Sequence, residues 1–218
     1  MNRPLHNTID WRVYLVTDDD VLGERALIDV VLEAVAGGVG AVQLRKKHAS
    51  TREFMSAARA LQPHLQALNI PLIINDRVDV AWAVGADGVH IGQSDMPYPL
   101  ARELLGPEAL IGISIESLEQ LQQAESWDLA YVALSPVFHT PTKTDTLVEW
   151  GIAGIRQARA LTRHRLLGIG GLNSATVAAP LAAGLEGIAV ISAICAAPDP
   201  RHAAQDLHQR VTELGYKP

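Results

Sequence analysis

The sequence predicts a single (β/α)8 barrel, also called a TIM barrel, from three observations. Eight short apolar runs recur along the chain, and a longer stretch with helical spacing follows most of them. The length of 218 residues is close to the ~250 residues typical of this fold. The first run leads into TDDDVLGER (17–25), whereas a doubly wound open sheet normally has a glycine-rich phosphate turn there. We therefore prefer the barrel, and the open sheet is the alternative.

Each apolar run has the length and composition of a short buried strand. In chain order the runs are VYLVTD (13–18), AVQLRKK (41–47), PLIIND (71–76), GVHIG (88–92), LIGISI (110–115), YVALSPV (131–137), RLLGIGG (165–171) and GIAVISAI (187–194).

The stretches between the runs carry apolar residues at spacings of three and four, as an amphipathic helix requires. Those at 25–38 and 51–69 end near Gly or Asn, as helices often do. The stretch at 97–106 starts with prolines, and Asn173 with Ser174 supplies a capping signal for the stretch after it. The pattern is thus a repeated strand–helix architecture without a sequence repeat.

The whole chain, residues 1–218, is expected to form one barrel domain, with residues 1–12 as a short N-terminal extension. A net charge of −6 argues against a protein that coats nucleic acid. The first residues have no signal-peptide core, and no apolar run is long enough to span a bilayer. We expect a cytoplasmic protein without membrane or nucleic-acid partners, and the sequence leaves a homo-oligomer open.

Polar side chains gather at the carboxyl ends of the predicted strands, where barrels of this type carry their chemistry. In the second run, period-two spacing sends Gln43, Arg45 and Lys47 to one face of the strand. If that face is the barrel interior, two positive charges in a partly dry site call for an anion. Arginine forms a fork suited to phosphate oxygens, and lysine adds a point charge. The simpler interpretation is an exposed strand end with solvated cations.

Two carboxylates, Asp76 and Asp95, follow the third and fourth strands. They suit one Mg²⁺ ion, which proteins usually hold with one or two carboxylates while waters and substrate phosphates complete the octahedron. The structural alternatives are that Asp76 pairs with Arg77 or caps a helix, and that Asp95 caps the helix starting near Pro97. The nearby cations favour the metal, because a metal–diphosphate complex needs both signs. A pair for acid–base catalysis is a further option.

The last three strands predict a second anion site. Thr140, Thr142 and Lys143 follow the sixth strand, while IGG (169–171) and VIS (190–192) end the seventh and eighth. Barrels often bind phosphate in the last two of these places through backbone N–H groups. Considered alone, the segment after the sixth strand could be an ordinary polar loop, and the glycines after the seventh could only permit a tight turn. Taken together, the strand ends suit the joining of two phosphorylated molecules with loss of diphosphate.

In their order and mutual spacing, several segments resemble the thiamine phosphate synthase family. They are QLRKK, INDRVDVAWAVGADGVHIGQSD, IGIS, SPVFHTPTK, GIGG and VIS, and the resemblance runs from residue 14 to residue 194. It implies a (β/α)8 barrel and a magnesium-dependent transferase of thiamine biosynthesis. Such an enzyme joins hydroxymethylpyrimidine diphosphate to a thiazole phosphate, with or without a carboxylate, and gives thiamine phosphate and diphosphate.

The resemblance also implies roles for individual residues. The implied Mg²⁺ ligands are Asp76 and Asp95. The implied catalytic residues are Arg45, Lys47, Ser114 and Lys143. The implied substrate-binding residues are Gln43, Leu44, Arg45, Lys46, Lys47, Asn75, Ser114, Thr140, Pro141, Thr142, Lys143, Gly171, Ile191 and Ser192.

The chain departs from the family pattern at Ser135, where a glycine is frequent, and at Ile115–Glu116, where a Thr-His pair is frequent. The related thiazole tautomerases place a histidine where this chain has Pro136, and they lose parts of the diphosphate site. The complete Gln-x-Arg-x-Lys set and Pro136 therefore favour the synthase. The alternatives are a tautomerase-like isomerase, a non-catalytic barrel that binds thiamine precursors, and another phosphate-handling barrel enzyme.

Overall fold

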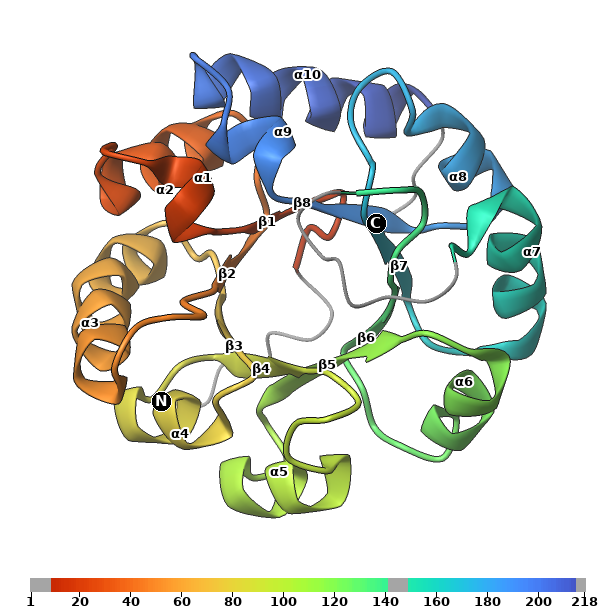
Figure 1. The fold of residues 1–218 in the computed structure, drawn as a ribbon, viewed down its shortest axis with the longest axis horizontal. Coiled ribbons are helices and arrows are strands. Elements are labelled where there is room, and N and C mark those ends of the chain that lie inside the picture. Colours follow the sequence, from red (N-terminus) through yellow and green to blue (C-terminus); the bar gives the residue numbers. More distant parts are fainter. Residues whose placement is uncertain (1–8, 141–148, 215–218) are drawn as a thin grey trace.

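A computed structural model describes residues 9–140 and 149–214, and within them eight parallel strands close into a barrel (Figure 1). Each strand pairs with the next in chain order, and β8 pairs with β1 to complete the ring. The strands are β1 (Val13–Val16), β2 (Ala41–Leu44), β3 (Leu72–Asn75), β4 (Gly88–Ile91), β5 (Leu110–Ile115), β6 (Tyr131–Leu134), β7 (Leu166–Ile169) and β8 (Gly187–Val190). The predicted fold class is confirmed.

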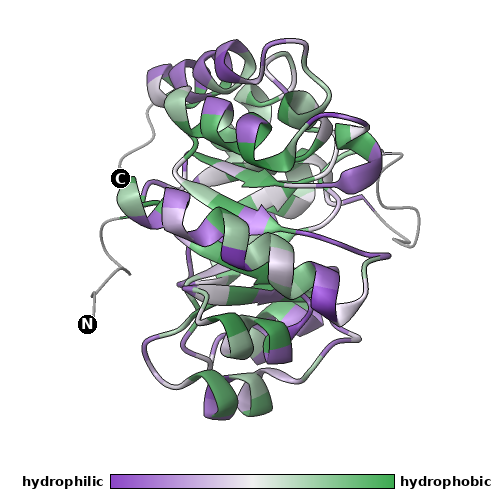
Figure 2. Cartoon of the chain, turned by 90° about the vertical axis from the view of Figure 1, so that its left-hand side faces the viewer, coloured by the Kyte–Doolittle hydropathy of each residue, from purple (hydrophilic) through white to green (hydrophobic). Residues whose placement is uncertain are grey.

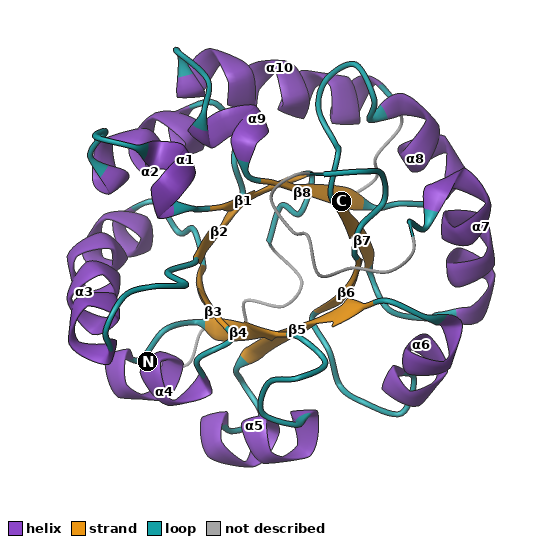
Figure 3. Ribbon diagram, in the orientation of Figure 1, coloured by secondary structure: helices purple, strands orange, loops and turns teal. Residues whose placement is uncertain are grey.

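Helices surround this ring on the outside (Figure 3). They are α1 (Asp19–Leu22), α2 (Leu27–Ala36), α3 (Thr51–Ala67), α4 (Val78–Val84), α5 (Tyr98–Leu105), α6 (Leu118–Ala124), α7 (Gly151–Leu161), α8 (Ala178–Ala183), α9 (Ser192–Cys195) and α10 (Pro200–Glu213). Local sequence explains several of their ends. Ser50 and Glu53 form a capping box at the start of α3, and Asp199 caps α10. Gly85 ends α4 in the left-handed conformation.

The last strand is shorter than its apolar run predicts. The run extends to Ile194, but β8 ends at Val190, and the one-turn helix α9 begins at Ser192. A purely apolar run does not separate a buried strand from a buried helical turn, because both lack polar positions. Ser192, the polar residue within the run, thus lies at the start of a helical turn and not on the strand.

The apolar residues form two layers, one between strands and helices and the other inside the barrel. Figure 2 shows the strands as hydrophobic, whereas the helices alternate between hydrophobic and hydrophilic residues. The interior layer contains Tyr14, Ile73, Tyr131 and Leu167. Trp11, within the predicted N-terminal extension, also packs there and is almost fully buried. Ile9 and Trp11 therefore belong to the barrel core, whereas Asp10 and Arg12 between and after them are only partly buried.

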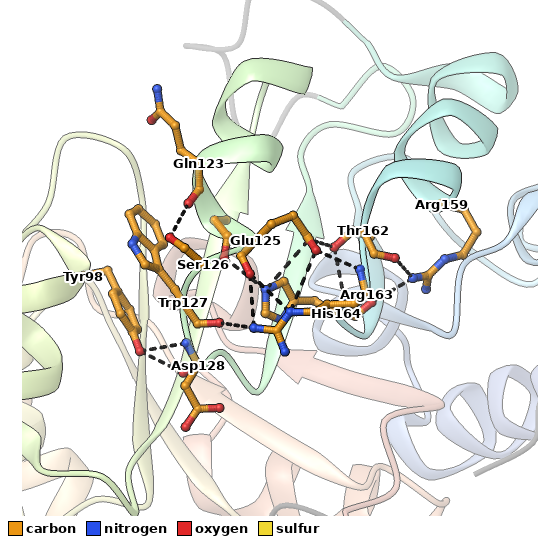
Figure 4. A network of polar contacts seen from close by, with 11 residues as sticks. Tyr98, Gln123, Glu125, Ser126, Trp127, Asp128, Arg159, Thr162, Arg163 and His164 are labelled. Atoms are coloured by element: carbon orange, nitrogen blue, oxygen red, sulfur yellow. Dashed lines mark hydrogen bonds and ion pairs between the residues drawn. The ribbon is translucent and has the colours of Figure 1, made fainter.

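A polar network braces the end of the barrel where β6 and β7 begin (Figure 4). The Glu125 carboxylate accepts hydrogen bonds from the Thr162 hydroxyl and from the backbone N–H of Arg163. The buried ring of His164 contacts the Ala124 carbonyl, with Nε2 3.0 Å from the oxygen. These contacts tie α6 to the segment after α7, at the end of the barrel opposite to the predicted site.

Candidate active site

Strand alternation places four polar side chains inside the barrel near the carboxyl ends of its strands. They are Gln43, Asn75, His90 and Ser114. Gln43 lies beside Val16 and Ile73 in the strand register, Asn75 beside His90, and Ser114 beside Ala133. All four polar residues are buried, with 3–9% of their surface exposed. Because the carboxyl ends of parallel strands meet at one rim, these side chains form the floor of a common site.

A cavity of about 870 Å³ opens above this floor. Its volume is in the upper range for small-molecule sites. The predicted site residues that line it are Gln43, Arg45, Lys47, Asn75, Asp76, Asp95, Ser114, Thr140, Gly171, Ile191 and Ser192. Residues of the loops that follow the strands complete its lining. The structure thus brings the described residues of both predicted anion sites to one cavity.

Arg45 lines this cavity, and its guanidinium forms an ion pair with Asp18. Its side chain is 19% exposed, and its backbone N–H donates to the Thr17 hydroxyl at 3.0 Å. The Asp18 carboxylate also accepts from the backbone N–H groups of Asp20 and Val21 and so caps α1. The partner of Arg45 is therefore fixed in place, and the interpretation of a fully solvated cation fails for this residue.

Lys47 and the carboxylates Asp76 and Asp95 form a second charged group. The Lys47 ammonium donates to Asp76 Oδ2 at 2.6 Å. Burial opposes ionisation of Asp76, but the hydrogen bond and charge of Lys47 outweigh it and hold its pKa below the ordinary value. Burial, together with the charge of Asp76, raises the pKa of Asp95. Each of the two carboxylates thus contributes to the pKa shift of the other.

The structural alternatives for the two carboxylates do not hold. Arg77 pairs with Asp79, and the carboxylate of Asp76 faces Lys47 and Asp95. Asp95 accepts from the backbone N–H of Gly92 at 2.7 Å, whereas α5 starts without any side-chain cap. Asp76 also has a φ of 63°, a left-handed conformation that Asp tolerates better than most residues. Its backbone N–H donates to the His90 carbonyl at 2.8 Å, which ties this turn to β4.

The Asp76–Asp95 pair fits a divalent cation that is held partly by substrate. Within residues 9–140 and 149–214, no group of three or more His, Cys, Asp and Glu side chains gathers as a metal site. Two carboxylates suffice for Mg²⁺ when phosphate oxygens and waters complete its coordination. A cation between them would also relieve the repulsion that raises the pKa of Asp95. The residues therefore fit the metal that the resemblance implies.

The turn after β7 requires its two glycines. Gly170 has a φ of 98° and Gly171 a φ of 66°, both in the left-handed region. A Cβ on Gly171 would lie 2.7 Å from Phe138 Cβ and 2.9 Å from the His139 carbonyl oxygen. The turn therefore packs directly against the loop after β6, and its backbone forms part of the cavity wall.

Not every predicted residue reaches the cavity. Leu44 is fully buried in the layer between strands and helices, because alternation turns its side chain away from the interior. The prediction of a substrate contact is therefore wrong for its side chain. Lys46 pairs with Asp19 at 2.9 Å and lines an adjacent hollow of about 570 Å³. Pro141, Thr142 and Lys143 lie outside the described residues.

Sequence reasoning missed several residues of the site. Asp18 was part of an acidic turn with no assigned role, although it follows a strand end as the other site residues do. Gln93 donates to the Ser114 carbonyl at 2.6 Å and lines the cavity. His90 was expected to be a satisfied barrel residue, and it is buried and hydrogen-bonded, yet it also lines the cavity. No sequence spacing predicts a contact across the barrel.

Fold and cavity together define a class of protein: a (β/α)8 barrel with a pocket at the carboxyl ends of its strands that is lined by both cations and carboxylates. The family model described as thiamine monophosphate synthase matches residues 13–194. This chain belongs to that family, which confirms the resemblance seen in the sequence. Among the described residues, no helix is both long enough and apolar enough to cross a membrane.

Individual relatives agree with this assignment. The chain is similar to the thiamine-phosphate synthase of Albidiferax ferrireducens, with 52% identity over 92% of this chain and 91% of the relative. It is 49% identical to the thiamine-phosphate synthase of Vibrio parahaemolyticus, over 90% of this chain and 96% of the relative. The solved structure of a thiamine phosphate pyrophosphorylase from Pyrococcus furiosus matches with a TM-score of 0.85 and 35% identity, over 94% of this chain and 97% of that structure.

Proposed function

We propose that this chain joins hydroxymethylpyrimidine diphosphate to a thiazole phosphate and releases thiamine phosphate and diphosphate. One observation carries the proposal: Arg45, Lys47, Asp76 and Asp95 line the same cavity as the Gly170–Gly171 turn. One side of the cavity thus suits a metal–diphosphate group, and the other offers backbone to a monophosphate. The names of the relatives support the synthase over a thiazole tautomerase or a non-catalytic barrel.

The chemistry requires a leaving group to depart as a polyanion. The bond between the pyrimidine methylene carbon and the diphosphate oxygen breaks, and the aminopyrimidine ring shares the positive charge. The thiazole nitrogen then donates its electron pair to the methylene carbon, and diphosphate carries away the electrons of the broken bond. This sequence needs no nucleophilic side chain, because both reacting groups belong to the substrates.

The side chains of the site act mainly through charge and position. Arg45 and Lys47 stabilise the negative charge that grows on the leaving group. Gln43, Asn75 and Ser114, on the buried floor, orient the pyrimidine, and the apolar interior below them excludes water. Asp76 and Asp95 would hold Mg²⁺, which supplies further positive charge to the diphosphate when bound. By resemblance, Lys143 also contacts the diphosphate, and Thr140, Pro141 and Thr142 contact the thiazole phosphate.

The proposal is tested by mixing both substrates with the purified chain and measuring diphosphate and thiamine phosphate together. We expect both products in equal amounts with Mg²⁺, and a large loss of both after EDTA treatment that added Mg²⁺ restores. Each substrate alone serves as the control. Isomerised thiazole without diphosphate would identify a tautomerase, and binding of both substrates without products would identify a non-catalytic barrel; either result would overturn the proposal.

A further inference from the structure

A chain of hydrogen bonds crosses the barrel interior beneath the cavity. Gln43 Nε2 donates to the Tyr14 hydroxyl at 2.9 Å, and this hydroxyl lies 2.9 Å from that of Tyr131. The Tyr131 hydroxyl lies 2.9 Å from Nδ1 of His90, whose Nε2 lies 2.9 Å from the Ser114 hydroxyl. These hydrogen bonds therefore link Gln43 on β2 to Ser114 on β5, two residues that both line the cavity.

Donor and acceptor counting gives this chain a direction. An amide nitrogen only donates, so the oxygen of Tyr14 accepts from Gln43. Among the residues that the structure describes, the other hydrogen-bond partner of this hydroxyl is Tyr131, so the hydrogen of Tyr14 goes there. If Tyr131 donated to Tyr14 instead, the hydroxyl hydrogen of Tyr14 would be buried without an acceptor, which is costly. Tyr131 is then left to donate its own hydrogen to Nδ1 of His90.

The direction fixes the form of His90 and the role of Ser114. A neutral imidazole that accepts at Nδ1 carries its proton on Nε2. His90 therefore donates from Nε2 to the Ser114 oxygen. The Ser114 hydroxyl keeps its own hydrogen for an acceptor in the cavity.

The surroundings favour this arrangement. Tyr14 and Tyr131 are almost completely buried, and burial raises the pKa of both hydroxyls, so each keeps its hydrogen at neutral pH. A Cβ on Gly112 would overlap the ring and hydroxyl of Tyr131, so the glycine makes the space that Tyr131 occupies. The rings of His90 and Tyr131 are stacked, with an interplanar angle of 12°. Packing thus holds each side chain of this hydrogen-bond series in a fixed position.

We propose that Tyr14, Tyr131 and His90 are positioning residues: they form a one-way relay that holds His90 as its Nε2–H form and commits the Ser114 hydroxyl to donate to the substrate. The identity of that substrate, the pyrimidine diphosphate, rests on the proposed function. The relay itself rests only on contacts within the chain.

The relay is tested first by nitrogen-15 NMR of the histidine rings without substrate. Because the chain has 8 histidines, the His90→Gln variant identifies the signal of His90 by its loss. We expect the wild-type ring as the Nε2–H form, and in Tyr131→Phe a mixture of both neutral forms, because Nδ1 loses its donor. Tyr98→Phe is the matched control, since its hydroxyl contacts Asp128 and Arg102 outside the barrel, and the His90 signal should stay unchanged. A wild-type Nδ1–H form, or an unchanged signal in Tyr131→Phe, would overturn the proposal.

Kinetics then test whether the relay acts through Ser114. We expect Tyr131→Phe to raise the KM for the pyrimidine substrate by about two- to tenfold, the effect of one neutral hydrogen bond. In a Ser114→Ala background, the same exchange should raise KM no further, because the two residues act as one unit. Full additivity would overturn the coupling. Absence of diphosphate release in the wild type would instead refute the proposed function and leave the NMR result intact.

Discussion

Arg45 and Lys47 are each paired with a carboxylate at the mouth of the barrel. Pairing limits the electrostatic cost of placing two cations along one half-buried wall. Asp18 is itself held by the backbone of α1, whereas Lys47 is 47% exposed and pairs with a proposed metal ligand. Arg45 is therefore the more rigidly placed of the two cations, and the one best suited to a fixed contact with the leaving group.

At the residue scale, the first prediction concerns Arg45→Ala. Removing one preorganised charge contact should lower kcat by ~100-fold or more. The barrel should still fold, because Arg45 lines the cavity and is not part of the apolar core. Arg201→Ala, which breaks a surface pair with Glu33, is the control and should keep normal turnover. Steady-state diphosphate release checks this, and near-normal turnover in Arg45→Ala would remove Arg45 from the leaving-group role.

The sequence predicted these charged residues because strand position alone places them. Gln43 lies on β2, Arg45 and Lys47 follow the end of this strand at Leu44, and the structure lines the cavity with all three. Their partners were harder to predict. The contact of Arg45 with Asp18 spans 27 positions, and that of Tyr14 with Tyr131 spans 117. Such contacts depend on which strands become neighbours and how large side chains fill the interior, which local patterns do not record.

At the element scale, the turn after β7 shapes the side of the cavity proposed for the thiazole phosphate. Its backbone packs against the loop after β6, so a change in either segment moves the other. This contact joins the ends of β6 and β7, two neighbouring strands of the ring.

The second prediction compares Gly171→Ala with Gly85→Ala. Both glycines have nearly the same φ, 66° and 65°, but a Cβ on Gly85 would meet nothing within 4 Å. Gly85→Ala should therefore lose about 1 kcal/mol of unfolding free energy from backbone strain alone. Gly171→Ala should lose more, by about 1–3 kcal/mol from overpacking, and should raise the KM for the thiazole phosphate. Denaturant unfolding and steady-state kinetics check both; equal losses with unchanged KM would contradict the packing argument.

The third prediction concerns the segment before β1. Asp10 accepts from Arg12 Nε at 2.8 Å, Arg12 Nη1 donates to Thr212 on α10 at 2.8 Å, and His208 on α10 also faces Asp10. Burial opposes ionisation of Asp10, but the bonds from Arg12 outweigh it and lower its pKa. The resulting stability is present above the ordinary aspartate pKa of about 3.9 and is lost as pH falls through the lowered value.

Asp10→Asn should therefore lower the unfolding free energy by about 1–2 kcal/mol at neutral pH, and the difference from wild type should shrink in acid. The pair of Arg77 and Asp79 has the same sequence spacing but is more exposed, so Asp79→Asn is the matched control with little effect. Urea unfolding from neutral to acidic pH measures both variants. A constant difference at all pH values would show that the charge of Asp10 is not the cause.

All eight strands were predicted from the sequence because each is a short apolar run set between helical patterns. Their ends were less exact. The runs at 165–171 and 187–194 extend past the strands into the Gly170–Gly171 turn and into α9. At both places a change in backbone conformation ends the strand, and a hydrophobicity pattern does not reveal such a change.

At the scale of the whole molecule, closure of the ring explains why residues distant in sequence share one site. Each parallel strand delivers its carboxyl end to the same rim, so residues from all eight strands meet around one cavity. The fold class and the position of the site were predictable for this reason. The shape of the cavity was not, because it depends on how interior side chains such as Tyr14 and Tyr131 fill the barrel below it.

The central claim is that this cavity binds a metal–diphosphate complex through cations on one side and carboxylates on the other. Calorimetric titration of the wild type with inorganic diphosphate, with and without Mg²⁺, tests it most directly. We predict clear binding with Mg²⁺ and at least about tenfold weaker binding without it, since an uncompensated carboxylate pair repels the anion. Diphosphate that binds equally well in both conditions would contradict the account.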